Sequence, residues 1–250
     1  MLAEQHPRQY DGALVMCGFV AGGVTETAYA ANARILFDYF FPSALPGDAF
    51  DVPIGLPYAP GSPLFGSIQN ALIAGLFSSG QPTIQLGVTA HLPFRNANEL
   101  IASILTVLGF NVRFTNDILA RTHGGLPFDN TRSVYSGSAD DVALNAVVQR
   151  FASDPNAIHY LSRYYTSSGA LTIPVLTLHT TFDPVAPFVQ EVTYSSTVTA
   201  QGAGSLLAQQ SVSRYGHCAF KPEEVRNAFS ALTEWVETGV TPANGDVTVP

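Results

Sequence analysis

The chain has 250 residues, 46% of them hydrophobic, which is enough for one sizeable core and a smaller appendage. Nineteen acidic against eleven basic residues give a formal net charge of −8, which excludes a basic surface for the phosphate backbone of nucleic acids. No apolar run reaches the roughly 18 uncharged residues of a membrane span, and Met1 is not followed by the basic and apolar regions of a signal peptide.

The first predicted element is a short buried strand from Ala13 to Cys17. Gly12 precedes this apolar run and Gly18 follows it. Such a run is typical of a parallel strand that is covered on both faces. A bare edge would expose unpaired backbone groups beside apolar side chains, which proteins avoid. We therefore expect this edge to pair with a second copy of the chain, with a complementing N-terminal chain, or with rearranged local structure.

A long insertion follows the first strand and is predicted to be mainly helical. Pro- and Gly-rich stretches such as 42–63 separate its helical parts. Ser138 precedes Asp140 and Asp141, as an N-cap precedes the carboxylates of a first turn. The four expected helices span 26–41, 66–76, 98–109 and 139–152.

Two strands and a final helix are predicted after the insertion. The second strand, 173–178, carries Pro174 near its start, where a missing N–H is tolerated. The third strand, 206–212, runs into a loop. Pro222 then opens an amphipathic helix, and Gly239 supplies its stop. The predicted order is strand, insertion, strand, helix, strand, loop and helix.

Asp183 follows the second strand, and His217 lies in the loop after the third. Each alone is a common structural residue, because aspartate before proline forms turns and a loop histidine is usually a satisfied polar group. Their joint placement is more informative, since the carboxyl ends of parallel strands form the ligand-binding edge of a sheet. We interpret them as the acid and the base of a Ser-His-Asp triad, in which the acid orients the imidazole that takes the nucleophile's proton.

Four stretches of the sequence form a recognisable series: YDGALVMCG at 10–18, VYSGSADDVALN at 134–145, LHTTFDP at 178–184 and YGHC at 215–218. In this order they resemble consecutive landmarks of a bacterial secreted α/β-hydrolase family, of the esterase and lipase kind, with a helical lid. The resemblance implies Asp183 as the triad acid and His217 as the base, in the chain order of that fold. It also implies that the reaction is hydrolysis of a small carboxylic ester.

The resemblance further implies an α/β fold in two parts. Residues 1–18 and 169–250 would form the C-terminal portion of an α/β-hydrolase trunk, with about three strands of its parallel sheet. Residues 19–168 would form the helical lid. The remaining histidines lack the spacing of metal ligands, so we expect no metal and no cofactor.

A nucleophile elbow of the form Gly-x-Ser-x-Gly does not occur in the sequence. Three interpretations follow. The chain is truncated before the serine, or is one half of a protein whose other half is a separate chain. Alternatively, it works with a substitute nucleophile, for which Ser136 and Ser138 are the candidates. In the third interpretation it is a non-catalytic relative that binds small apolar molecules or serves as an interaction module.

The two cysteines, Cys17 and Cys218, are too few and too far apart for a zinc ribbon or a C-x-x-C redox motif. In the topology that the resemblance implies, both lie at one edge of the sheet. A disulfide would then tether the loop of His217 to the trunk, with two separate buried thiols as the alternative. A disulfide would place the protein in an oxidising compartment, secreted or periplasmic.

Overall fold

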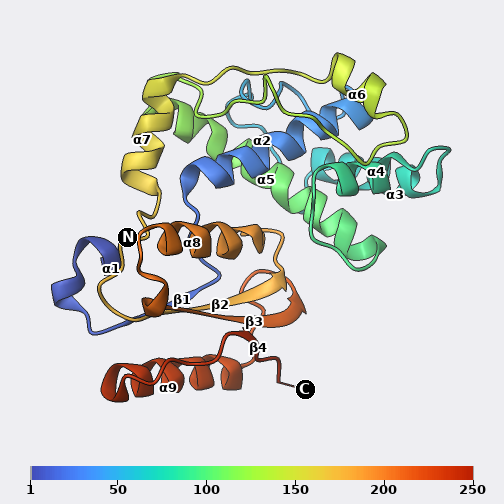
Figure 1. Cartoon of the computed structure of the whole chain (residues 1–250). Helices are drawn as coiled ribbons and strands as arrows, with labels where there is room; N and C mark the ends of the chain where they lie inside the picture. Colours follow the sequence, from blue (N-terminus) through green and yellow to red (C-terminus); the bar gives the residue numbers. More distant parts are fainter. Residues whose placement is uncertain (1, 250) are drawn as a thin grey trace. The chain divides into compact units, whose positions relative to one another are not determined.

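The computed structural model describes residues 2–249 (Figure 1). They divide into two compact units, one made of residues 2–23 and 162–249 and the other of Val24–Leu161. The sequence-based division had its boundaries at 18 and 169. The role of the second unit as a lid stays a prediction. Within residues 2–249, none of the helices combines the length and the apolar content that crossing a bilayer requires.

The first unit is an α/β layer structure (Figure 1). Its elements in chain order are α1 (Leu2–Gln5), η1 (Pro7–Gln9), β1 (Ala13–Met16), β2 (Val175–Phe182), α8 (Val189–Ala200), η2 (Gly204–Leu206), β3 (Leu207–Tyr215), α9 (Pro222–Thr238) and β4 (Gly245–Asp246). The strands pair in the order β1-β2-β3-β4, and all pairs are parallel. The predicted α/β fold with a parallel sheet is therefore confirmed, and the short β4 is an addition that the sequence did not predict.

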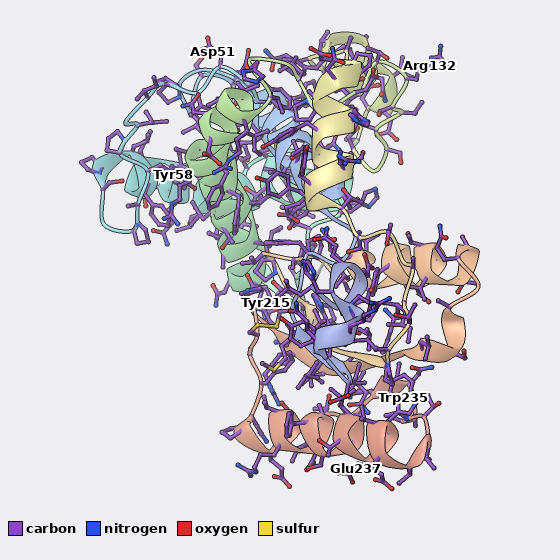
Figure 2. All side chains as sticks on the ribbon, turned by 90° about the vertical axis from the view of Figure 1, so that its left-hand side faces the viewer. Asp51, Tyr58, Arg132, Tyr215, Trp235 and Glu237 are labelled. Carbon is purple, nitrogen blue, oxygen red and sulfur yellow. A yellow bond between two sulfur atoms is a disulfide. The ribbon has the colours of Figure 1, made fainter. Side chains whose placement is uncertain are left out.

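The sheet is covered on both faces, as the apolar strands predict. Figure 1 shows α8 on one face and α9 on the other. Val175 of β2 belongs to the core on the α8 side, whereas Leu176 belongs to the core on the α9 side, as alternation along a strand requires. Figure 2 shows Trp235 of α9 on the sheet side of the helix and Glu237 on the opposite side. The predicted limits of α9 are confirmed, because Pro222 opens it and Gly239 ends it with a φ of 77°.

The second unit is helical. Its elements are α2 (Gly23–Phe40), α3 (Pro63–Phe77), α4 (Pro82–Thr89), α5 (Ala97–Arg121), α6 (Asp141–Val147) and the greater part of α7 (Pro155–Tyr165). Helices α3, α4 and α5 pack on one another. One core joins α2, α3, α4, α5 and α6, and among its fully buried members are Phe37, Leu72, Leu86, Leu108 and Leu144.

Two helix limits in this unit were predicted wrongly. Gly109 does not end α5, which continues to Arg121; this glycine is buried in the helix beside Tyr58, whose hydroxyl donates to the carbonyl of Leu105 one turn earlier. The helix expected over 139–152 is only α6, and Asp140 rather than Ser138 caps it by accepting from the N–H of Ala143.

The early end of α6 has a visible cause. Asn130 exchanges two hydrogen bonds with the backbone of Phe151, through its own N–H and its side-chain oxygen. Arg150 donates to the carbonyl oxygens of Asn130 and Ser133 at 2.8 and 2.7 Å. These long-range bonds hold the residues after α6 in an extended course, so that the helix does not continue.

Arg34 of α2 is a fully buried charge that organises the Pro-rich stretch after the helix. Its Nε donates to both carboxylate oxygens of Asp38, at 2.8 and 2.9 Å. Its Nη2 donates to the carbonyl oxygens of Leu45, Pro46 and Gly47, at 3.0, 3.1 and 2.8 Å. One guanidinium thus satisfies three consecutive backbone carbonyls.

Replacing Arg34 by alanine is expected to lower the free energy of unfolding by about 3–5 kcal/mol, because Asp38 and the three carbonyls lose their donor. Urea unfolding followed by far-ultraviolet circular dichroism measures the change. The control is Arg132→Ala, a substitution of an exposed arginine of the same unit (Figure 2). Equal unfolding midpoints for the two variants would contradict this role of Arg34.

Candidate active site

The parallel register of β2 and β3 brings the two predicted site residues to one edge of the sheet. Phe182 of β2 pairs with Tyr215 of β3 at the carboxyl ends of these strands. Asp183 is the next residue after Phe182, and His217 lies two residues after Tyr215. The two side chains therefore meet, with His217 Nδ1 2.8 Å from Asp183 Oδ2.

Asp183 is completely buried, and its carboxylate is held from two sides. Its Oδ1 accepts the backbone N–H groups of Val185 at 2.8 Å and Ala186 at 3.1 Å. Its Oδ2 faces His217 Nδ1. These contacts fix the plane of the carboxylate, so that one oxygen serves the backbone and the other serves the imidazole.

The side chain of His217 is 39% exposed and lies in residues 216–221, here called the histidine loop. When Nδ1 donates its proton to Asp183, a neutral imidazole has its lone pair on Nε2. Thr180 of β2 donates from Oγ1 to the carbonyl of Gly216 at 2.6 Å and anchors the start of the loop. This arrangement is that of a general base with its orienting acid.

An ion pair anchors the far side of the histidine loop. Arg214, near the end of β3, donates to Glu224 of α9 through Nη1 at 2.9 Å and Nη2 at 3.0 Å. Its Nη1 also donates to the carbonyl of Ala219 within the loop at 2.5 Å. The Glu224 carboxylate accepts the backbone N–H groups of Lys221 and Val249 as well. The hydrogen bond from Arg214 and these two backbone donors outweigh burial and lower the pKa of Glu224 to about 2.

This lowered pKa predicts how stability changes with pH. A carboxylate with a folded pKa of about 2 and an ordinary value of 4.5 stabilises the fold above pH 4.5, and the contribution is lost as the pH falls toward 2. The variant Glu224→Gln is therefore expected to have a free energy of unfolding about 2 kcal/mol lower than the wild type at neutral pH. It should also lose less stability on acidification. Urea midpoints measured at several pH values test this. Glu223→Gln, the same change at the exposed neighbour, should follow the wild-type curve.

Cys17, the residue after β1, forms a disulfide with Cys218, so the predicted bond is confirmed. It spans a sequence separation of 201 residues and ties the histidine loop to the end of β1. Figure 2 draws it in yellow beside Tyr215, the last residue of β3. Disulfides form and persist in oxidising compartments, which agrees with that part of the predicted localisation.

The same disulfide decides how a cluster of three metal-binding side chains is interpreted. One ligand atom each of Cys17, His217 and Cys218 lies within 4.8 Å of the others. Cysteine binds metals as the thiolate. Because both sulfurs are joined in the disulfide, this cluster offers a metal only the imidazole in this state.

The two candidate substitute nucleophiles lie in the helical unit. Ser138 donates its backbone N–H and its hydroxyl to Asp141 Oδ1, at 2.8 and 2.5 Å. These bonds, with the N–H of Gly137, lower the pKa of Asp141, which makes its carboxylate a weak base. Ser136 is exposed. Among residues 2–249 neither hydroxyl is hydrogen-bonded to a histidine or a lysine, so their role as nucleophiles stays a prediction.

The sequence assigned no role to a pair of polar side chains that the fold places next to Asp183. His179 of β2 and Glu191 of α8 are buried and face each other, with 3.1 Å between His179 Nδ1 and Glu191 Oε1. Thr177 and Gln209 donate to the other carboxylate oxygen, both at 2.6 Å. The available signal was the spacing of two residues between Thr177 and His179, which puts two polar side chains on the face of the strand that also carries Val175.

No family model matches the chain, and no curated protein matches it. Among solved structures, feruloyl esterase B from Aspergillus oryzae is similar with a TM-score of 0.40 and 14% sequence identity. The match covers 96% of this chain and 57% of that enzyme, so the chain spans a little over half of its length.

Proposed function

We propose that Asp183 and His217 are the acid and base of a hydrolase that cleaves small carboxylic esters. The proposal rests on one observation. At the carboxyl edge of a parallel sheet, Nδ1 of a partly exposed imidazole lies 2.8 Å from an oxygen of a buried carboxylate. In this tautomer Nε2 accepts a proton from a nucleophile, and the nearby carboxylate stabilises the imidazolium that forms. The choice of an ester as the substrate follows the sequence resemblance.

The proposed reaction is acyl transfer to water in two steps. A serine hydroxyl attacks the ester carbonyl while His217 Nε2 takes its proton, and the same imidazolium then protonates the departing alcohol. A water molecule, deprotonated by His217 in its turn, attacks the acyl-serine, and the imidazolium returns the proton to the serine oxygen as the acid is released. Backbone donors of an oxyanion hole hold the charge of each tetrahedral intermediate. We propose that the serine and these donors lie outside residues 1–250, with Ser136 and Ser138 as the alternative nucleophiles.

We also propose that the outer edge of β1 receives a strand of a complementing N-terminal chain or of a second copy. Within residues 2–249, β1 pairs with β2 alone. The N–H of Ala13 donates to the residue before β2 and that of Cys17 donates to β2 itself, so the alternate residues Leu14 and Met16 direct theirs to the outer edge. A parallel strand added here would end at the same edge of the sheet as Asp183 and His217.

Self-association through this edge is measurable by sedimentation velocity. If a second copy binds, the wild-type chain is a dimer and Met16→Lys, which places a charge on the edge, is a monomer. Phe229→Lys is the control, because that side chain is also exposed, at 61%, but belongs to the helix α9 and not to an edge strand. A monomeric wild type would exclude the second copy and leave the complementing chain as the proposed partner.

Labelling with a fluorophosphonate, followed by peptide mapping, tests the ester-hydrolase function. We expect stoichiometric labelling of one serine that disappears in His217→Ala and is kept in His159→Ala, a substitution of an exposed histidine on α7. Labelling that persists in His217→Ala would contradict the proposed base. A folded chain that is not labelled, alone or in its assembly, would favour the non-catalytic interpretation, in which uptake of an apolar ligand is independent of His217.

A further inference from the structure

His179 and Glu191 form a buried polar pair next to Asp183, and their hydrogen bonds determine which of their atoms carry protons. The ring of His179 is completely buried, and each of its nitrogens has one close partner. Its Nε2 lies 2.7 Å from the carbonyl oxygen of Ala186, and its Nδ1 lies 3.1 Å from Glu191 Oε1. A carbonyl oxygen only accepts hydrogen bonds, so Nε2 carries a proton.

The second proton depends on whether Glu191 is a carboxylate or an acid. Oε2 of Glu191 accepts from the hydroxyl of Thr177 and from Nε2 of Gln209. The Gln209 amide is oriented unambiguously, because the same Nε2 donates to the backbone carbonyl of Glu191 at 2.9 Å. Two donors on one oxygen favour the ionised form. An ionised Glu191 accepts from Nδ1, so both ring nitrogens of His179 carry protons.

The charge on this ring lies close to the proposed acid. His179 Nε2 is 3.7 Å from Asp183 Oδ2. The two residues also share Ala186, which donates its N–H to Asp183 Oδ1 and accepts from His179 with its carbonyl. The Phe188 ring approaches His179 edge-on, with 5.9 Å between the centroids, and brings no charge. Glu191 and Asp183 are therefore the ionised groups that face His179.

We propose that His179 is a buried imidazolium that positions Asp183 and keeps the negative charge of the Asp183 carboxylate next to His217. The inference rests on the proposed function only where it calls Asp183 an acid; the charge state stands on the contacts alone. Burial disfavours a charged ring, but the hydrogen bond and charge of Glu191, the carbonyl of Ala186 and the charge of Asp183 outweigh it and raise the pKa of His179. When His217 takes up a proton, the four side chains alternate in sign from Glu191 to His217, so the new charge meets an opposite neighbour.

Nitrogen NMR of the chain labelled with ¹⁵N-histidine tests this directly. At about pH 8, where a histidine with an ordinary pKa is neutral, we expect protons on both ring nitrogens of His179. Nuclear Overhauser contacts to Thr177 and Phe188 assign the signal without a variant. A ring with one proton, on Nε2 alone, would overturn the inference whatever the enzymatic activity is.

The variant Glu191→Gln removes the charge that holds the second proton and is nearly isosteric. We expect the ring of His179 to become neutral at the same pH, whereas it stays doubly protonated in Glu237→Gln, the same change on the exposed side of α9. A ring that keeps both protons in Glu191→Gln would contradict the assigned role of Glu191. If the assembled enzyme turns over an ester, Glu191→Gln should lower kcat by about tenfold with little change in KM. Absence of turnover with a doubly protonated His179 would reject the proposed function and leave this inference intact.

Discussion

Replacing Asp183 by asparagine is expected to lower kcat for a small ester by about 10⁴-fold, the cost of holding the histidine of a triad in the wrong tautomer. The reason lies in the two backbone donors at Oδ1. The N–H groups of Val185 and Ala186 require an acceptor there, so the oxygen of the new amide takes that place. Its NH₂ group then occupies the position of Oδ2 and faces His217 Nδ1.

An amide NH₂ donates, so Nδ1 of His217 has to accept and the ring proton moves to Nε2. The nitrogen that should take the proton of the nucleophile is then already protonated. Because both backbone hydrogen bonds are kept, the fold is expected to survive, and circular dichroism checks this. The loss should fall on kcat rather than on KM.

Hydrolysis of a p-nitrophenyl ester and the rate of fluorophosphonate labelling measure the effect in the same assembly. Asp11→Asn, at an exposed aspartate of the same unit, is the matched control and should keep the wild-type rate. An Asp183→Asn variant that hydrolyses the ester at the wild-type rate would show that this carboxylate does not orient the base.

The sequence predicted those parts of the fold in which local pattern and tertiary environment agree. The apolar runs of β1 and β2, and the helix from Pro222 to Gly239, each combine a clear period with a clear boundary residue. The prediction from the sequence failed where a long-range contact determines the local structure. Glycine is a residue type that often ends a helix, but Gly109 lies inside α5, buried beside the ring of Tyr58.

The candidate site divides in the same way. Asp183 and His217 were recognisable because each follows a strand, and parallel pairing brings strand ends together. The pair of His179 and Glu191 was not, because the two side chains come from β2 and α8 and only packing brings them within hydrogen-bonding distance. A buried charge is informative only through its partners, and those are a property of the folded chain.

Removing the disulfide by Cys17→Ser with Cys218→Ser is expected to lower the free energy of unfolding by about 5 kcal/mol, because the cross-link closes a loop whose ends are 201 residues apart. In the chain-entropy model a longer loop gains more from a cross-link, and this one spans most of the chain. Urea unfolding of the oxidised and the serine forms measures the difference. Equal stability of the two forms would contradict the expectation.

The same double variant separates the stabilising role of the disulfide from its role at the site. The histidine loop has a second anchor, since Arg214 joins Ala219 and Glu224 on its far side, and Thr180 anchors Gly216. We therefore expect the serine form to keep the contact between His217 and Asp183 under native conditions. Labelling by the fluorophosphonate should then persist in the serine form at low temperature and fail on warming earlier than in the oxidised protein. Loss of labelling in a fully folded serine form would instead show that the tether itself holds the base in place.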